Sequence, residues 1–181
     1  MEGGIEISGE RFEERFLPHC DAAHNLARWL MRNDRDAEDA VQESYLRAYK
    51  AFARFRGGDP RACKAWFLTI VRHVCYTSLR KRHRHDAEEP FDEELHQPEA
   101  EGEGDAALWR AARADLLRQA LEKLPPEFRE MIVLCDIEGL GYKEIAVVAD
   151  LPIGTVMSRL SRARGKLRAE ALALLKQEAL R

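Results

Sequence analysis

The chain has 181 residues, of which 45% are hydrophobic and 34% are charged, and its formal net charge is -3. This composition is typical of a soluble, mostly helical protein with one large or two small domains, and it excludes an intrinsically disordered chain. No apolar run is long enough to cross a membrane and the first residues lack the pattern of a signal peptide, so we expect a cytoplasmic protein without membrane insertion.

The first predicted element is an amphipathic helix from about Arg11 to Met31. Its apolar residues recur at steps of three and four, as a helix with one buried face requires. They are Phe12, Phe16, Cys20, Ala23, Ala27 and Leu30. Asn33 and Asp34 follow, and they can end this helix and cap the next one.

A second helix is expected from about Asp36 to Phe52. Its core stripe consists of Val41, Tyr45, Ala48, Tyr49 and Phe52, and its other face carries Asp39, Gln42, Glu43, Leu46 and Lys50. An exposed leucine flanked by carboxylates and an amide can dock on a basic partner surface. The same face can also be a solvated one with a Glu43 to Arg47 helix pair, and the pattern alone leaves both interpretations open.

Residues 55–60 form a predicted loop that ends in a helix start, with Asp59 as N-cap and Pro60 at the first helical position. The helix after it is expected to run to about Arg84. It lies within the stretch from Arg54 to Arg84, which holds nine basic residues and one acid. One side of this helix carries Arg72, His73, Tyr76, Arg80 and Arg84. Cations interleaved with an aromatic ring suit single-stranded nucleic acid, and the loop can receive an extruded base. A merely basic surface helix is the alternative.

An acidic segment separates this helix from the rest of the chain. From Asp86 to Asp105 there are ten acids and no Lys or Arg, together with Pro90, Pro98, Gly102 and Gly104. No helical or strand period is present, so a flexible, self-repelling linker is predicted. It is either a spacer or a segment that imitates nucleic acid in the basic channel of a partner.

The C-terminal part begins with a predicted helix from Leu108 to Leu124, which Pro125 and Pro126 end. A second one follows from about Phe128 to Cys135, and Gly139 is its expected stop. These two helices would support a helix-turn-helix.

The helix-turn-helix is predicted from two short helical patterns that meet at a break over residues 151–154. The inner face of the first consists of Ile145, Ala146, Val148 and Ala149, and that of the second of Val156, Leu160, Ala163 and Leu167. The outward face is then left to Thr155, Ser158, Arg159, Arg162 and Lys166. Residues 151–169 hold five basic residues and no acid, which suits phosphates and guanine edges. A solvated basic helix in an ordinary bundle is the competing interpretation.

These motifs together resemble those of the group IV, or extracytoplasmic-function (ECF), sigma factors of bacterial RNA polymerase. The stretch from Asp36 to Leu46 resembles the family's core-binding motif, and Phe55 to Arg72 resembles its promoter-melting segment. Leu124 to Glu130 and Tyr142 to Arg164 resemble its C-terminal domain. The resemblance covers nearly all of the chain, and it has three motifs in the family's order and at its separation.

The resemblance implies an all-helical protein of two small domains joined by a flexible acidic linker. Residues 1–85 would be sigma region 2, 86–107 the linker, which the family threads through the polymerase, and 108–181 sigma region 4. The protein would be no enzyme and would need no cofactor. Its partners would be core RNA polymerase, through the beta-prime clamp helices and the beta flap, promoter DNA and an anti-sigma factor.

The resemblance also assigns roles to residues. Those implied to bind the polymerase are Asp36, Asp39, Gln42, Glu43 and Leu46. Those implied to open and read the minus-ten element are Arg56, Arg61, Arg72, His73, Tyr76 and Arg80. Those implied to read the minus-thirty-five element are Thr155, Ser158, Arg159, Arg162 and Lys166.

Five residues depart from the family's pattern. His73 stands where Asn is usual, and Thr77 and Ser78 stand where Asp and Arg are common, so the minus-ten preference cannot be borrowed. Asp150 replaces the usual Gly in the helix-turn-helix, and Asp tolerates the left-handed conformation better than most residues. Gly141 replaces a capping Ser and is a weaker cap.

Two other functions are alternatives to that of a sigma factor. A stand-alone helix-turn-helix regulator would bind duplex DNA without polymerase. A metal-dependent hydrolase would have to use His83, His85 and His96, which lie in or beside the flexible linker, where a preorganised site is not expected.

The four cysteines give little support to a redox or metal function. They are widely spaced and form no Cys-x-x-Cys pair, so neither a disulfide framework nor the usual structural zinc site is encoded. Most often such cysteines are small buried hydrophobic residues. A redox or metal role for Cys63, His73 and Cys75 rests on a His-x-Cys pattern alone, and we expect no metal site.

Overall fold

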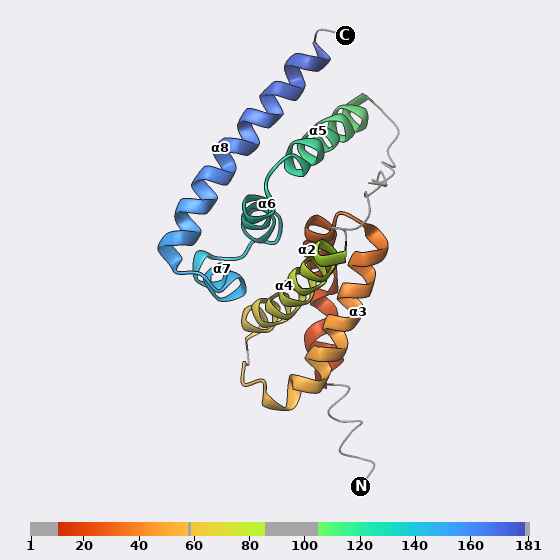
Figure 1. Ribbon diagram of the computed structural model, residues 1–181, viewed down its shortest axis with the longest axis vertical. Coiled ribbons are helices and arrows are strands. Elements are labelled where there is room, and N and C mark those ends of the chain that lie inside the picture. The colour runs from red at the N-terminus through yellow and green to blue at the C-terminus, as the bar shows by residue number, and fades with distance from the viewer. Residues whose placement is uncertain (1–10, 58, 86–104, 180–181) are drawn as a thin grey trace.

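The computed structural model describes residues 11–57, 59–85 and 105–179, and helices joined by short loops make up this part of the chain (Figure 1). No strand occurs among these residues, so the predicted all-α class is confirmed. The same described part contains no helix that is both long and apolar enough to cross a membrane. Most of the predicted linker, including His96, lies outside the described residues.

The N-terminal half is a bundle of three main helices, α2 (Cys20–Met31), α3 (Asp34–Ala51) and α4 (Pro60–His85). Residues 11–16 are also helical, and short 3-10 turns lie at η1 (Leu17–His19) and η2 (Phe52–Arg54). The single helix predicted over residues 11–31 is therefore interrupted. Pro18 lies in the first turn of η1 and has no N–H for a continuous helical ladder.

The helix starts in this half follow local capping chemistry. The Asn33 side chain accepts a hydrogen bond from the Asp36 N–H at 3.0 Å, and the Asp59 carboxylate accepts one from the Arg61 N–H at 3.3 Å. In the core of this half, Phe12 and Phe16 stack at 4.7 Å between ring centroids and are fully buried. Tyr49, expected in the core stripe, is instead 40% exposed and meets Phe12 edge to face.

The C-terminal half contains α5 (Asp105–Glu122), α6 (Pro126–Ile132), a π-helical turn η3 (Val133–Ile137), α7 (Tyr142–Ala149) and α8 (Ile153–Glu178). The long helix α8 runs along the outside, with α5 and α6 packed against it (Figure 1). Gly139 adopts φ +69 and ends the helical run, as predicted.

The helix-turn-helix is formed by α7 and α8. Of the predicted inner faces, Ala146 and Leu167 are half-buried and the other six residues are buried, with Ile145, Val148, Val156 and Leu160 at most 1% exposed. Asp150 ends α7 with φ 53, in the left-handed region, as expected at this position. The Glu144 carboxylate accepts a hydrogen bond from the Gly141 N–H at 2.6 Å, which compensates for the missing side-chain cap.

The two halves pack directly against each other. Helix α4 lies against α7, and α2 lies against α6 and η3. The sequence predicted two modules joined only by a linker and did not predict this contact. One buried apolar cluster runs from Phe12 in the first half to Ala163 in the second.

Two glycines, Gly139 after η3 and Gly165 inside α8, allow a test of the backbone conformation. A Cβ added at Gly139 or Gly165 meets no atom within 4 Å, so there is room for a side chain at both positions. The two positions differ only in backbone conformation. Gly165→Ala, inside α8, is expected to stabilise the protein by about 0.5–1 kcal/mol. Gly139→Ala is expected to destabilise it by about 1 kcal/mol, because an L-residue is strained at positive φ. Urea unfolding of both variants measures the difference, and equal effects would contradict the assigned conformation at Gly139.

Candidate functional site

The polar face of α3 is open to solvent. Leu46 is 59% exposed, and Asp39, Gln42 and Glu43 around it are also exposed. The opposite side of α3 holds the bundle together through Ala37, Ala40, Val41, Ser44 and Ala48, all buried. An exposed leucine among carboxylates, on a rigid helix whose other side is fully packed, forms a ready contact surface for a protein partner.

Asp36 differs from its neighbours on this face. Its carboxylate forms an ion pair with Arg82 of α4, and its side chain is only 21% exposed. Asp36 thus joins α3 to α4, in addition to any contact with a partner. Glu43 pairs along its own helix with Arg47 at 2.5 Å, as the competing interpretation of this face expected, but that exposed pair leaves the surface accessible.

The loop between η2 and α4 has a defined shape. The Phe55 ring lies 4.6 Å from the Trp66 ring and covers Gly57, where an added Cβ would come within 2.3 Å of it. Arg56 and Arg61, at the two ends of the loop, are both exposed. Glycine at position 57 therefore lets the loop fold over its own aromatic side chain while its cations face solvent.

On α4, two of the predicted nucleic-acid residues are engaged by the C-terminal half. The Glu130 carboxylate of α6 accepts a hydrogen bond from Arg72 Nε at 2.5 Å and another from the Tyr76 hydroxyl at 3.1 Å. The Arg72 guanidinium also lies over the Tyr76 ring at 4.6 Å. His73 and Arg80, on the same helix, remain exposed. We call Arg72, Tyr76 and Glu130 the Glu130 junction.

The Glu130 junction is buried. The Glu130 side chain has no exposed surface, and that of Arg72 is 23% exposed. Burial raises the pKa of Glu130, because a charged carboxylate loses its hydration, and Arg72 opposes this shift. Burial, followed by the charge of Glu130, also raises the pKa of the Tyr76 hydroxyl. Removal of one member of such a buried pair leaves the other without compensation.

A second set of contacts joins the halves at Glu138, directly after η3. The Glu138 carboxylate pairs with Lys64 Nζ at 3.0 Å and accepts a hydrogen bond from Asn25 Nδ2 at 2.9 Å. The Lys64 ammonium also donates to the Glu138 carbonyl at 2.7 Å. Nearby, the buried Arg129 donates to the carbonyl of Trp29 in α2 at 2.8 Å.

The sequence pattern predicts no role for Asn25, Lys64 or Glu138, and it places Glu130 only within the stretch from Leu124 to Glu130 that resembles the C-terminal domain. The one signal in the sequence is Glu130 itself, an acid beside the apolar run that begins at Met131. A buried acid needs a partner, but nothing in the spacing pointed to Arg72, which is 58 residues earlier.

The outward face of α8 differs in part from the prediction. Arg162 and Lys166 are exposed, whereas Thr155, Ser158 and Arg159 are half-buried. Lys166 lies 5.6 Å from the Phe128 ring of α6, and the charge of Arg159 is the smallest of the influences that oppose the raised pKa of Glu130. Arg162 is therefore the one predicted arginine of this helix that faces solvent directly.

The cysteines and histidines form no metal centre in the described part of the chain. No group of three or more His, Cys, Asp or Glu residues is arranged there to hold an ion. Cys63 and Cys75 are buried and His73 is exposed, so the three do not share a surface. Burial raises the pKa of the Cys75 thiol to about 12, which keeps it protonated and unreactive at neutral pH. The side chains of His83 and His85 lie outside the described residues.

Comparisons with known proteins agree with this geometry. The family model for sigma-70 region 2 matches residues 16–85, and the model for sigma-70 region 4 matches residues 114–167. The chain is 35% identical over 167 residues to the ECF RNA polymerase sigma factor SigE of Mycolicibacterium smegmatis, which covers 91% of this chain and 63% of that protein. It is 35% identical to the ECF RNA polymerase sigma factor EcfG of Rhodopseudomonas palustris, over 77% of this chain and 74% of that one.

The fold is also that of a solved sigma factor. The structure of RpoE in complex with the anti-sigma factor NepR from Bartonella quintana superposes with a TM-score of 0.74 at 30% sequence identity, covering 89% of this chain and 96% of RpoE. Both sigma-70 regions, in order, and relatives matched over most of their length distinguish this chain from a stand-alone helix-turn-helix regulator. The chain belongs to the sigma-70 family, in the ECF group of RNA polymerase sigma factors, which are transcription initiation factors and not enzymes.

Proposed function

We propose that this sigma factor binds core RNA polymerase through the exposed face of α3 and reads a promoter through α4 and α8. The observation that carries the proposal is that Asp39, Gln42, Glu43 and Leu46 remain exposed although both halves are packed. Because core polymerase and the chromosome share the bacterial cytoplasm, the protein is expected there. The decisive experiment is in vitro transcription with purified core polymerase on a promoter library. Equal transcription with and without this protein would overturn the proposal.

The proposed division of labour follows the family models. Residues 1–85 would bind polymerase and the minus-ten element, 86–107 would be the linker, and 108–181 would bind the minus-thirty-five element. The region 2 match at residues 16–85 and the region 4 match at residues 114–167 support these limits. Helix α5 begins at Asp105, so its first turn falls within the proposed linker.

Minus-ten recognition is proposed for the loop and α4. Arg56, Arg61 and Arg80 present exposed cations to a single strand, with the exposed ring of His73 beside them, and Tyr76 supplies a ring for stacking. Flipped bases that find stacking partners and cations there offset the cost of unpairing, which is a few kcal/mol. Strand opening then draws on binding energy and needs no covalent chemistry.

The contact between the two halves, which we call the closed arrangement, limits this recognition. Arg72 and Tyr76 are bound to Glu130, so they cannot bind DNA while the halves are in contact. We propose that the described conformation is a resting state, and that the halves separate when the polymerase binds them at different places. The resting protein then has little affinity for the minus-ten strand, as a factor that opens promoters only with polymerase requires.

An anti-sigma factor is a proposed partner. The relative RpoE is solved in complex with the anti-sigma factor NepR, and its chain superposes on nearly all of this one. A protein that grips both halves would stabilise the closed arrangement, because it would add contacts available only in that state. The proposal is tested by copurification of the sigma factor from its own cells with and without an inducing stress.

Minus-thirty-five recognition is proposed for α8, with Arg162 as its principal cation. Arg162→Ala is expected to weaken promoter binding by the polymerase complex by about 1–3 kcal/mol if the guanidinium reads a guanine. Competition binding with wild-type and mutated upstream elements measures the effect of Arg162→Ala on promoter binding and on discrimination. Unchanged discrimination in Arg162→Ala would remove this role.

A further inference from the structure

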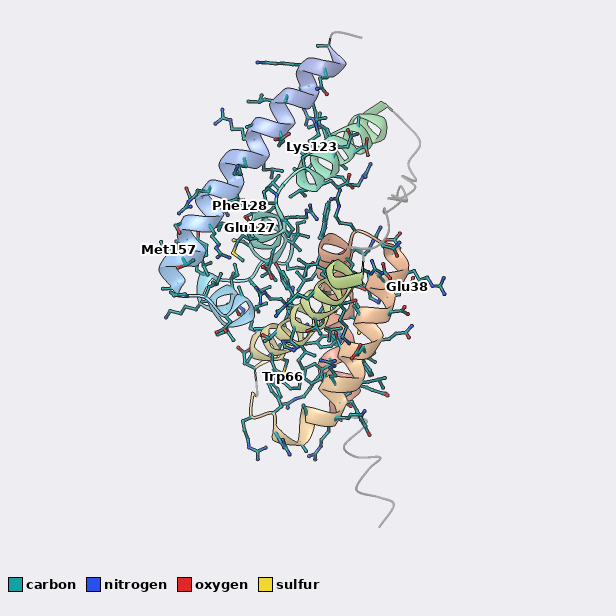
Figure 2. All side chains as sticks on the ribbon, in the orientation of Figure 1. Glu38, Trp66, Lys123, Glu127, Phe128 and Met157 are labelled. Atoms are coloured by element: carbon teal, nitrogen blue, oxygen red, sulfur yellow. The ribbon has the colours of Figure 1, made fainter. Side chains whose placement is uncertain are left out.

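The exposed face of α8 at the helix-turn-helix combines a cation with an apolar side chain. Met157 is 52% exposed and Ile153 is 43% exposed, in the first two turns of the helix. Figure 2 shows Met157 at the periphery of the molecule, near the end of α8 that meets α7. Ile153 and Met157 are four residues apart, so their side chains are neighbours on the helix surface.

The residues between Met157 and Arg162 on the helix surface are small. At 100° per residue, Met157 and Arg162 lie roughly 140° apart around α8. Gly154, Ser158 and Ser161 fall within this arc. A Cβ added at Gly154 would meet no atom within 4 Å, so nothing of the protein covers that position. A face of this shape lets base edges come close to the helix, with a thioether on one side and a guanidinium on the other.

We propose that Met157 is a specificity residue of the upstream element and that it contacts the 5-methyl group of one thymine. The inference rests on the proposed minus-thirty-five role of α8. A recognition helix places its N-terminal turns in the major groove, and the thymine methyl is the one apolar group that base edges present there. Arg162 then selects a guanine, and Met157 selects a thymine on the other side of the same face.

The chemistry of methionine fits this contact. Its unbranched, polarizable chain adapts to an apolar partner without exact shape matching. It can neither donate a strong hydrogen bond nor carry a charge, so it cannot select among guanine, adenine and cytosine by their polar edges. The contact is expected to discriminate thymine from cytosine, and from uracil, which lacks only the methyl group.

The test replaces each thymine of the upstream element in turn by deoxyuridine, in a promoter chosen from the transcription library. Binding is measured with the complex of core polymerase and the full chain. At one position, the wild-type complex is expected to bind the deoxyuridine promoter about fourfold more weakly, which corresponds to burial of one methyl group at about 0.8 kcal/mol. Met157→Ala is expected to lose this sensitivity at that position.

Two controls keep the outcomes distinct. Leu172→Ala changes a side chain of similar exposure, 49%, further along α8 and is expected to keep the fourfold ratio. If scrambling the whole upstream element has no effect, the proposed role of α8 fails. If scrambling matters but every deoxyuridine is neutral, or Met157→Ala keeps the fourfold ratio, the role of Met157 alone is overturned. Because Met157 is exposed, its truncation is not expected to disturb the fold.

Discussion

Glu130→Lys is expected to separate the two halves of the free protein. The carboxylate of Glu130 is fully buried between Arg72 and Tyr76, so a lysine would place a second cation beside Arg72. Disruption of a buried ion pair costs about 3–5 kcal/mol, which is roughly two to three and a half orders of magnitude in the equilibrium between closed and open forms. Small-angle X-ray scattering should then report a larger radius of gyration, and energy transfer between dyes on α3 and α8 should fall.

Opening has a functional consequence that scattering alone does not report. With Arg72 and Tyr76 released, Glu130→Lys is expected to bind a single-stranded minus-ten oligonucleotide more tightly than the wild-type protein does, in the absence of polymerase. Glu130→Gln keeps the shape of the side chain without its charge, so a smaller effect is expected. Fluorescence anisotropy with a labelled oligonucleotide measures the affinities of the wild-type protein, Glu130→Gln and Glu130→Lys, which are expected to increase in this order.

Controls must separate opening from unfolding, since Glu130 also lies within the C-terminal half. Helix content by circular dichroism tests the fold, and Lys64→Glu disrupts the other set of contacts without altering any residue of that half. Glu14→Lys makes the same charge change at an exposed acid outside the Glu130 junction and is expected to stay closed. An expanded shape in Glu14→Lys, or a compact one in Glu130→Lys with native helix content, would contradict the proposed resting state.

The elements that could be predicted are those with local causes. Asn33 and Asp59 cap helices because their side chains reach backbone N–H groups two or three residues away, and such spacing is visible in a sequence. Asp150 was expected in a left-handed conformation for an equally local reason. The exposed face of α3 was also predicted, because helical periodicity separates it from the buried stripe.

The contacts between the halves could not be predicted because their causes are not local. Asn25 and Glu138 are 113 residues apart, and Tyr76 and Glu130 are 54 apart. Helical periodicity reports that a side chain faces inward but not which distant helix it meets. Arg159 shows the same limit, since its angle on α8 favoured solvent, whereas in the structure it is half-buried.

Leu46→Asp is expected to weaken the binding of core polymerase by roughly 30- to 1000-fold, which is the largest effect among the proposed interface residues. A leucine that is 59% exposed at the centre of a polar face is a candidate anchor, and loss of such anchors costs about 2–4 kcal/mol in protein interfaces. An aspartate in its place would also bury a charge against the partner. Surface plasmon resonance with immobilised core enzyme measures the affinity.

The exposure of Leu46 also allows the test to separate an effect on binding from an effect on folding. Because its side chain is largely solvated in the free protein, the change is expected to alter the free energy of unfolding by no more than about 0.5 kcal/mol. Leu117→Asp is the matched control, since Leu117 is 46% exposed on α5 and outside the proposed surface. Asp39→Lys and Glu38→Lys form a second pair on α3, in which only the first lies on the face around Leu46. Normal polymerase affinity in both Leu46→Asp and Asp39→Lys would place the contact elsewhere and leave the exposed face of α3 as a solvated surface.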